Sequence, residues 1–272
     1  QLVQLEQSYS DLAAQGLGVV AISYDTVEIL QAFSERKGPF SYTMIADPES
    51  EVIEAFDLRN PNPDPGSRVD GMAYPGSYIV DANGVAQEKF FAESHRQRVT
   101  SDTVLMSVYG VGKSGGQRLE ADVPPQFKLV AFPSEEEILA GNSFALMVEF
   151  EMYDKVHLYG EGSDYTAVNL VLDDNPMLLS KELRLPEPEI MYLEVIDESV
   201  PVYHGKVNIV REVTLSPAFE GDSIEVSAML EYQTCDDEYC FQPASMPITF
   251  NLKVFGMDRE RAPEDVRHQE GG

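Results

Sequence analysis

The sequence predicts an α/β domain followed by an all-β domain, and three features of the 272-residue chain support this. Helix-like and strand-like segments alternate over residues 1–110, which is the pattern of an α/β domain. Short apolar runs separated by turn residues fill residues 119–257, as expected of an all-β domain. The Gly-rich stretch 111–118 is expected to be the linker between them, and the charged residues 258–272 a polar tail.

The first domain opens with an amphipathic helix, in which Leu2, Leu5 and Leu12 recur at helical spacing before Gly16 ends it. The motif Asp-x-Asn-Gly at 81–84 lies between two apolar runs and predicts a hairpin turn. The other predicted elements are, in order, a strand over 17–23, a helix over 26–33, a strand over 42–46, a helix over 50–56, a loop over 60–71, strands over 77–80 and 85–91, and a helix over 96–109. This order predicts a mixed sheet.

The second domain is predicted to contain about seven short strands. Apolar and polar residues alternate with period two over 224–230 and 248–254, as in strands with one buried face. Prolines mark loops or sheet edges at Pro124, Pro125 and Pro186. The predicted strands lie near 127–132, 143–153, 156–159, 167–172, 206–215, 223–233 and 246–254. Short strands at such intervals predict a β-sandwich.

The composition restricts the classes of partner. The formal net charge is −28, from 47 acidic and 19 basic side chains, and such a surface repels phosphate backbones and anionic lipid headgroups. We therefore expect no nucleic-acid binding. No apolar run approaches the roughly 20 residues that span a membrane, and no signal peptide is visible.

Cys235 and Cys240 are the two cysteines of the chain, and three interpretations are open: a structural disulfide, half of a metal site, or a redox pair. A bridge over about six residues stabilises a fold by only roughly 2 kcal/mol in the chain-entropy model. A metal site would need histidines in a paired motif, and the four histidines of the chain are scattered. His157, for example, lies in an apolar strand-like run, where a packed or half-exposed side chain is expected. We expect no metal and no dissociable cofactor.

The residues around the two cysteines resemble a known family. Cys-Asp-Asp-x-x-Cys followed by an aromatic residue and Pro243 is similar to the N-terminal domain of the thiol:disulfide interchange protein DsbD. The resemblance covers roughly residues 120–255 and implies an immunoglobulin-like β-sandwich whose cysteines, here Cys235 and Cys240, pass electrons to periplasmic partners. It also implies the catalytic role of this pair.

A second part of this resemblance lies at Val202-Tyr203-His204-Gly205-Lys206. In the family, a loop of two aromatic residues, Gly and Lys forms a cap over the disulfide. The resemblance therefore implies that Tyr203 and His204 cover Cys235–Cys240. Pro201 and Val202 stand where the best-known members carry an acidic pair.

The first domain resembles the thioredoxin-like redoxins of the alkyl hydroperoxide reductase/thiol-specific antioxidant family. The motifs that carry the resemblance are Leu17–Asp25, Asp47–Ser50 and Tyr74–Asp81. In that fold the proline of the last motif, here Pro75, is cis and faces the catalytic cysteine. The catalytic thiol lies at the start of the first long helix, where the helix dipole lowers its pKa. We expect that the first strand and the start of this helix are missing from the chain, as in a truncated domain.

These observations lead to two hypotheses. The first is an extracytoplasmic thiol–disulfide oxidoreductase of redoxin or antioxidant type, in which Cys235 and Cys240 exchange electrons with a thioredoxin-like or membrane thiol–disulfide protein. Peroxide or disulfide reduction would be linked to this exchange. The alternative is a non-catalytic binding or assembly subunit in which the disulfide is purely structural. A cysteine upstream of Gln1 would favour the enzyme.

Overall fold

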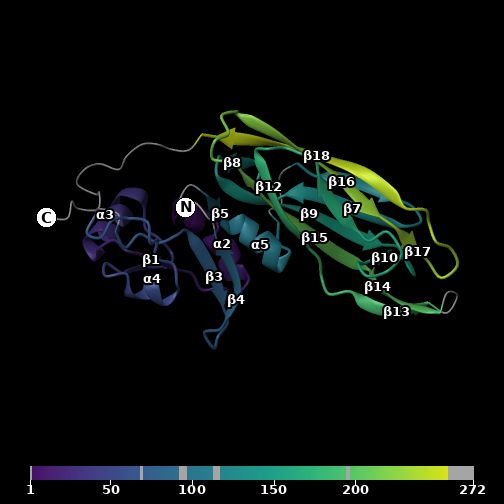
Figure 1. Cartoon of the computed structure of the whole chain (residues 1–272), viewed down its shortest axis with the longest axis horizontal. Helices are drawn as coiled ribbons and strands as arrows, with labels where there is room; N and C mark the ends of the chain where they lie inside the picture. Colours follow the sequence, from purple (N-terminus) through teal and green to yellow (C-terminus); the bar gives the residue numbers. More distant parts are fainter. Residues whose placement is uncertain (1, 68–69, 92–96, 113–116, 194–196, 257–272) are drawn as a thin grey trace. The chain divides into compact units, whose positions relative to one another are not determined.

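The computed structural model describes residues 2–67, 70–91, 97–112, 117–193 and 197–256. The chain divides into two compact units (Figure 1), and the boundary between them in the sequence lies between Val104 and Leu105. This boundary falls inside a helix a few residues before the predicted linker. The predicted polar tail, 258–272, and part of the linker lie outside the described residues.

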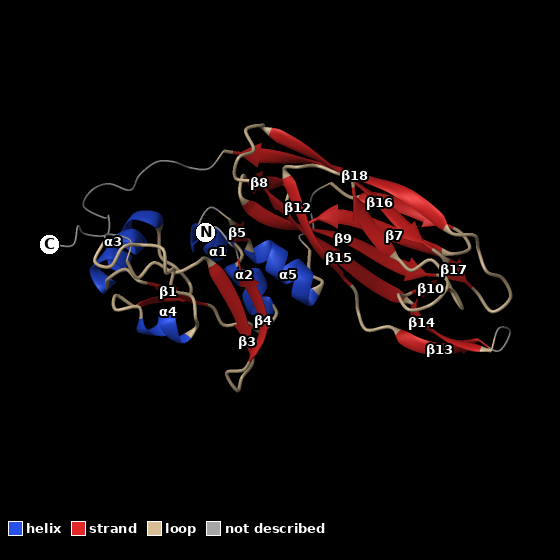
Figure 2. Cartoon of the chain, in the orientation of Figure 1, coloured by secondary structure: helices blue, strands red, loops and turns tan. Residues whose placement is uncertain are grey.

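The first unit is the α/β part of the chain (Figure 2). Thr26 caps its longest helix by accepting a hydrogen bond from the backbone N–H of Ile29. Asp81 closes the predicted hairpin turn by accepting hydrogen bonds from the backbone N–H groups of Asn83, at 2.8 Å, and Val85, at 2.9 Å. The elements are α1 (Leu2–Gln7), α2 (Tyr9–Ala14), β1 (Val20–Ser23), α3 (Val27–Lys37), β2 (Thr43–Ala46), α4 (Glu51–Ala55), β3 (Gly76–Val80), β4 (Ala86–Phe91), β5 (Arg98–Val99) and α5 (Ser101–Tyr109), whose second half belongs to the second unit.

The strands of the first unit pair differently from the prediction. In the described residues β1 pairs with β2 in parallel, and β3 pairs with β4 in an antiparallel hairpin. The predicted single mixed sheet is thus present as two separate pairs. Val20 and Ile22 of β1 are exposed, because no further strand or helix covers that face among the described residues.

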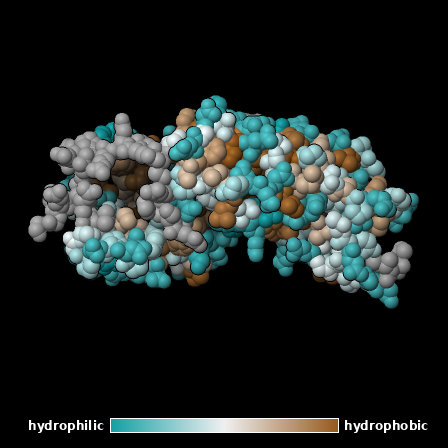
Figure 3. Space-filling model, turned by 45° about the horizontal axis from the view of Figure 1, so that its top comes forward, coloured by the Kyte–Doolittle hydropathy of each residue, from teal (hydrophilic) through white to brown (hydrophobic). Residues whose placement is uncertain are grey.

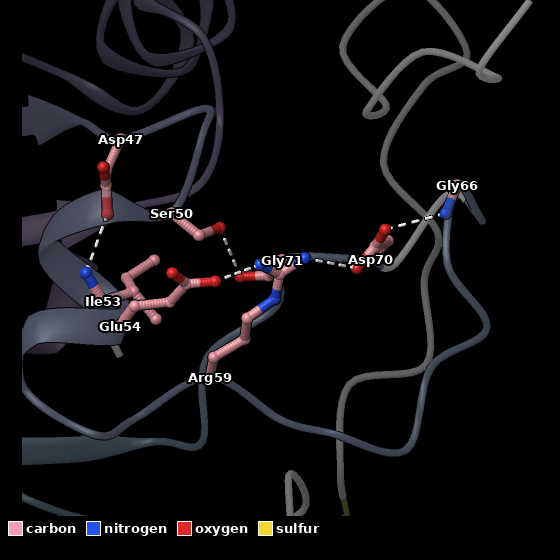
Figure 4. Close-up of polar contacts among 8 residues, drawn as sticks. All are labelled: Asp47, Ser50, Ile53, Glu54, Arg59, Gly66, Asp70 and Gly71. Atoms are coloured by element: carbon pink, nitrogen blue, oxygen red, sulfur yellow. Dashed lines mark hydrogen bonds and ion pairs between the residues drawn. The ribbon is translucent and has the colours of Figure 1, made fainter.

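A polar network fastens the loop before β3 to α4 (Figure 4). The Ser50 hydroxyl donates a hydrogen bond to the Gly71 carbonyl at 3.0 Å. Arg59 bridges the two sides, since its guanidinium pairs with the carboxylates of Glu54 and Asp70. Each of these charged groups therefore has its partner within the loop and helix, and the network is structural.

The predicted cis bond before Pro75 is wrong. The cis peptide bond among the described residues joins Pro124 and Pro125, so the Tyr74–Pro75 bond is trans. Trans is the ordinary state of an X–Pro bond, favoured by about 0.5–1 kcal/mol.

The described residues of the second unit are mostly strands (Figure 2), which pair into three sheets. Their strand orders are β12-β15-β9-β7-β6, β11-β16-β18-β8 and β13-β14-β10-β17. The strands are β6 (Leu119–Val123), β7 (Phe127–Pro133), β8 (Glu137–Leu139), β9 (Asn142–Met152), β10 (His157–Tyr159), β11 (Asn169–Leu172), β12 (Leu178–Arg184), β13 (Glu189–Leu193), β14 (Glu198–His204), β15 (Lys206–Leu215), β16 (Ser223–Tyr232), β17 (Thr234–Cys235) and β18 (Ala244–Phe255).

The first two of these sheets enclose the main core of a β-sandwich. Its largest fully buried side chains include Phe127, Phe144 and Phe150, and the rings of Phe127 and Tyr232 meet edge-to-face at 4.9 Å between centroids. The third sheet adds Leu158 and other side chains to the same core from one of its faces. Polar residues spread over the face shown in Figure 3, as the composition requires.

The seven predicted strands of this unit are confirmed as β7, β9, β10, β11, β15, β16 and β18. The prediction missed β6, β8, β12, β13, β14 and β17. Several of these are short or lie at sheet edges, where outward-facing residues are polar and the alternation is weak. The missed β14 matters most, because it contains the residues predicted to form a cap.

Candidate disulfide exchange site

Cys235 and Cys240 form a disulfide, as expected, with their Cα atoms 4.1 Å apart. Cys235 ends β17, and the chain turns back so that Cys240 pairs with it as an isolated antiparallel bridge. The Cα distance is slightly shorter than the roughly 4.4–6.8 Å expected for bridged cysteines. The disulfide therefore closes a tight loop at one end of the third sheet.

The loop between the cysteines is shaped by Asp236. Its carboxylate accepts hydrogen bonds from the backbone N–H groups of Glu238, at 2.8 Å, and Tyr239, at 2.6 Å. These bonds hold the pKa of Asp236 below its ordinary value. The neighbouring Asp237 pairs with Lys155 at 3.1 Å. The acidic run is thus a stabilised turn whose charge is partly compensated.

Polar side chains in and next to β17 hold both ends of this loop. Gln233 donates from its side-chain amide to the Phe241 carbonyl at 3.1 Å. The Thr234 hydroxyl, which is fully buried, donates to the Gln126 side chain at 2.6 Å. The backbone N–H of Phe241 donates a hydrogen bond to the Thr234 carbonyl at 3.0 Å. These bonds fix the position of the disulfide relative to the strands.

The two sulfur-bearing residues differ sharply in accessibility. Cys235 is only 1% exposed and packs against Tyr159, Val200 and Val202, whereas Cys240 is exposed. An incoming thiolate can therefore approach Cys240 and not Cys235. The sequence alone left the order of attack undecided, because it does not show which end of the loop enters the core.

Tyr159, which the sequence did not single out, contacts the disulfide. Its hydroxyl donates a hydrogen bond to Cys235 Sγ at 3.1 Å and lies 3.9 Å from Cys240 Sγ. Tyr165 stacks on its ring with centroids 4.1 Å apart. Burial, together with Tyr165, raises the pKa of Tyr159 to about 12. The phenol thus keeps its proton at neutral pH and remains a donor to the sulfur.

His157 lies directly opposite Cys235 on the neighbouring strand. The side chain is 2% exposed, and neither ring nitrogen has a hydrogen-bond partner among the described residues. Burial lowers the pKa of His157, and the nearby His204 lowers it further. The expectation of a packed histidine is confirmed, but its place beside the disulfide is new.

The predicted cap is wrong for Tyr203. β14 runs through His204, so these two residues point to opposite faces of a strand. Tyr203 pairs with Leu158 and is buried in the main core, away from Cys235. His204 pairs with His157, and their rings are 5.8 Å apart. It lies on the disulfide's face of the sheet but one strand further from Cys235 than His157.

No group of three or more His, Cys, Asp or Glu side chains is placed to hold a metal ion within the described part of the chain. In the same residues, no helix is long and apolar enough to cross a membrane.

Two family models match the chain in succession. Residues 1–89 match the AhpC/TSA family, and residues 129–251 match the N-terminal domain of the thiol:disulfide interchange protein DsbD. Alkyl hydroperoxide reductase C from Staphylococcus aureus, in strains COL and MRSA252 alike, is 30% identical over 90 residues. That alignment covers 32% of this chain and 44% of the relative. The chain thus spans less than half the length of these curated relatives.

Two solved structures are similar to parts of the chain. The N-terminal domain of Neisseria meningitidis DsbD in the reduced form is 16% identical, with a TM-score of 0.31, and the match covers 40% of this chain and 78% of that one. The N-terminal periplasmic domain of ScsB from Proteus mirabilis is 16% identical, with a TM-score of 0.33 and coverage of 56% and 55%. Both TM-scores lie below 0.5, so the domain assignment rests on the family matches.

Proposed function

We propose that this chain, which joins an AhpC/TSA domain to a DsbD N-terminal domain, is a thiol–disulfide oxidoreductase that works through Cys235 and Cys240. The observation that carries the proposal is the asymmetry of the disulfide. One sulfur belongs to an exposed residue, and the other is buried beside a phenol that donates a hydrogen bond to it. A disulfide that serves only as a staple has no need of this arrangement.

The exchange begins at Cys240. A thiolate of the partner attacks Cys240 Sγ, a bond forms between these sulfurs, and the Cys235–Cys240 bond breaks. Cys235 leaves as a thiolate, which the Tyr159 hydroxyl stabilises at 3.1 Å. A second partner thiol then attacks the mixed disulfide, so that the partner is oxidised and the Cys235–Cys240 pair is reduced. Reversal of the same steps transfers the electrons onward.

The partner in this proposal is a thioredoxin-like or membrane thiol–disulfide protein, and the chain works outside the cytoplasm. The match to the DsbD N-terminal domain supports both points. The same matches support a thioredoxin-like fold for the first unit and an immunoglobulin-like fold for the sandwich. The proposal keeps the predicted domains at 1–110 and 119–257 and the linker at 111–118, and the matches cover residues 1–89 and 129–251 of these ranges. A link to peroxide reduction, in an antioxidant role, follows from the AhpC/TSA match.

The alternative is a binding or assembly subunit with a structural disulfide. Its test is the capture of a mixed disulfide with a reduced thioredoxin-like protein. In the full chain, Cys235→Ser leaves Cys240 as the only thiol, and Cys240→Ser leaves Cys235. We expect the Cys235→Ser variant, preactivated with a small disulfide, to form the mixed species. The Cys240→Ser variant should form little, because Cys235 is buried. Equal or absent capture by both variants would support the structural role.

A further inference from the structure

We infer that His157 is the proton acceptor for Cys235 when this buried thiol attacks a mixed disulfide at Cys240. The inference rests on the proposed function and adds a residue to it. In the resolving step Cys235 must lose a proton in a site that excludes solvent. Only a side chain that is already inside the site can take that proton quickly.

The strand register places His157 next to this thiol. His157 is paired with Cys235 on one side and with His204 on the other, so the three side chains form a row across β17, β10 and β14 on one face of the sheet. Directly opposed residues of antiparallel strands have their Cβ atoms about 4.5–5.5 Å apart. Tyr159, two residues along β10, shares this face and bonds the same sulfur. His157 and Tyr159 thus flank Cys235 from one strand.

The imidazole is available for this role. Neither ring nitrogen of His157 is hydrogen bonded within the described part of the chain, although the side chain is 2% exposed. A buried polar group without a partner is destabilising, so such groups call for an explanation. In the structure, Cys235 is locked in the disulfide. On reduction it becomes a thiol, which is a donor for the imidazole.

The charges around His157 are consistent with a neutral base at rest. His204 faces it from β14, and burial and His204 both lower the pKa of His157. Asp236 and Asp237, from the loop after β17, oppose this effect, while Asp237 is also paired with Lys155. Tyr159, on the same strand, keeps its proton at neutral pH. His157 is therefore the imidazole that lies directly opposite Cys235 and can accept its proton.

The proposed step balances as follows. His157 takes the proton from Cys235 Sγ, and the thiolate attacks Cys240 Sγ. The Cys235–Cys240 bond forms, the bond from Cys240 to the partner sulfur breaks, and the partner leaves as a thiolate. The proton then passes from His157 to solvent after the bond exchange. In the reverse direction, a protonated His157 returns it to the leaving Cys235 thiolate.

The test uses the reduced full chain and the chromogenic disulfide dithiobis(nitrobenzoate). Cys240 attacks the reagent in a second-order phase, and Cys235 then displaces the second chromophore in a first-order phase. In the wild type we expect the first-order rate constant to rise with pH to a plateau. The midpoint of this rise should lie below about pH 6.5, the ordinary pKa of histidine. His157→Gln should slow this phase about 10-fold or more at neutral pH, while the second-order phase is unchanged. In His157→Gln the rate constant of the first-order phase should keep rising up to about pH 8.5, the ordinary thiol pKa.

His204→Gln is the matched control, since it alters the neighbouring imidazole of the same row. It should keep the plateau rate and move the midpoint upward, because His204 lowers the pKa of His157. A wild-type rate that keeps rising to about pH 8.5 would overturn the inference, and this result does not depend on any variant folding. Equal profiles for wild type and His157→Gln would overturn it as well. Either result would leave the proposed function standing if the Cys235→Ser variant still captures a protein partner.

Discussion

Replacing Tyr159 with Phe isolates the contribution of one hydroxyl to the exchange. The ring and its stacking on Tyr165 are kept, and the hydrogen bond to Cys235 Sγ at 3.1 Å is lost. In the disulfide this bond is made to a neutral sulfur, which is a weak acceptor. When Cys235 leaves as a thiolate, the same bond becomes charge-assisted. Such bonds contribute about 1.5–3 kcal/mol.

Because this contribution arises mainly as the thiolate forms, it lowers the barrier to reduction. We therefore expect Tyr159→Phe to slow reduction of the disulfide by dithiothreitol roughly 10- to 150-fold. The stability of the oxidised protein should fall by no more than about 1.5 kcal/mol. The rate is measured by quenching the reaction with acid, alkylating free thiols and counting them by mass spectrometry.

Tyr203→Phe is the matched control. Tyr203 is also a buried phenol, one strand away, but its side chain lies in the main core on the other face of the sheet. Its loss of a hydroxyl should leave the reduction rate within about 2-fold of wild type. Equal rates for the two variants would refute the role of Tyr159. A faster reaction in Tyr203→Phe would instead favour a cap at Tyr203.

Three further predictions concern stability and the first domain. Because burial lowers the pKa of His157, the unfolded chain binds more protons than the folded chain below about pH 6.5. The free energy of unfolding should therefore fall, by up to about 1.4 kcal/mol per pH unit, as the pH drops through that range. Denaturant unfolding at several pH values should show this slope in wild type and not in His157→Gln. Phe127→Ala leaves a cavity in the sandwich core, because Phe127 is fully buried, and should destabilise the second unit by about 3–5 kcal/mol in the same assay. Ile190→Ala, at an exposed position, should change the free energy of unfolding by less than about 0.5 kcal/mol. The chain has no cysteine before Cys235, so the full chain with Cys235→Ser and Cys240→Ser should consume hydrogen peroxide no faster than buffer; cysteine-independent turnover would show a peroxidase site of another kind.

Much of the second domain could be predicted because its central strands are half-buried and antiparallel. Alternation over Ile224–Leu230 and Ile248–Val254 reflects one core-facing side, and this local signal is sufficient to locate β16 and β18. β12 and β13 carry mostly exposed side chains, so their pairing depends on neighbours distant in the sequence. Local patterns do not encode such pairing.

The two cysteines of the site could be identified from the sequence, whereas the residues that surround them could not. The family resemblance around Cys235 and Cys240 implied the disulfide that the structure shows, but which aromatic residue contacts it depends on strand register. A shift of one residue exchanges the two faces of a strand, and this parity separates Tyr203, in the core, from His204. His157 and Tyr159 come to lie beside Cys235 through pairing across more than seventy residues. Their roles could therefore be inferred only from the fold.

The reduction potential of the Cys235–Cys240 pair tests the central claim most directly. The full chain is equilibrated with dithiothreitol or glutathione buffers of defined potential, and the reduced fraction is measured by thiol alkylation. Structural disulfides have potentials below about −300 mV, and pairs that exchange electrons with partners have higher ones. The proposed oxidoreductase requires a value above about −300 mV. A value well below that would identify the disulfide as structural and contradict the proposed function.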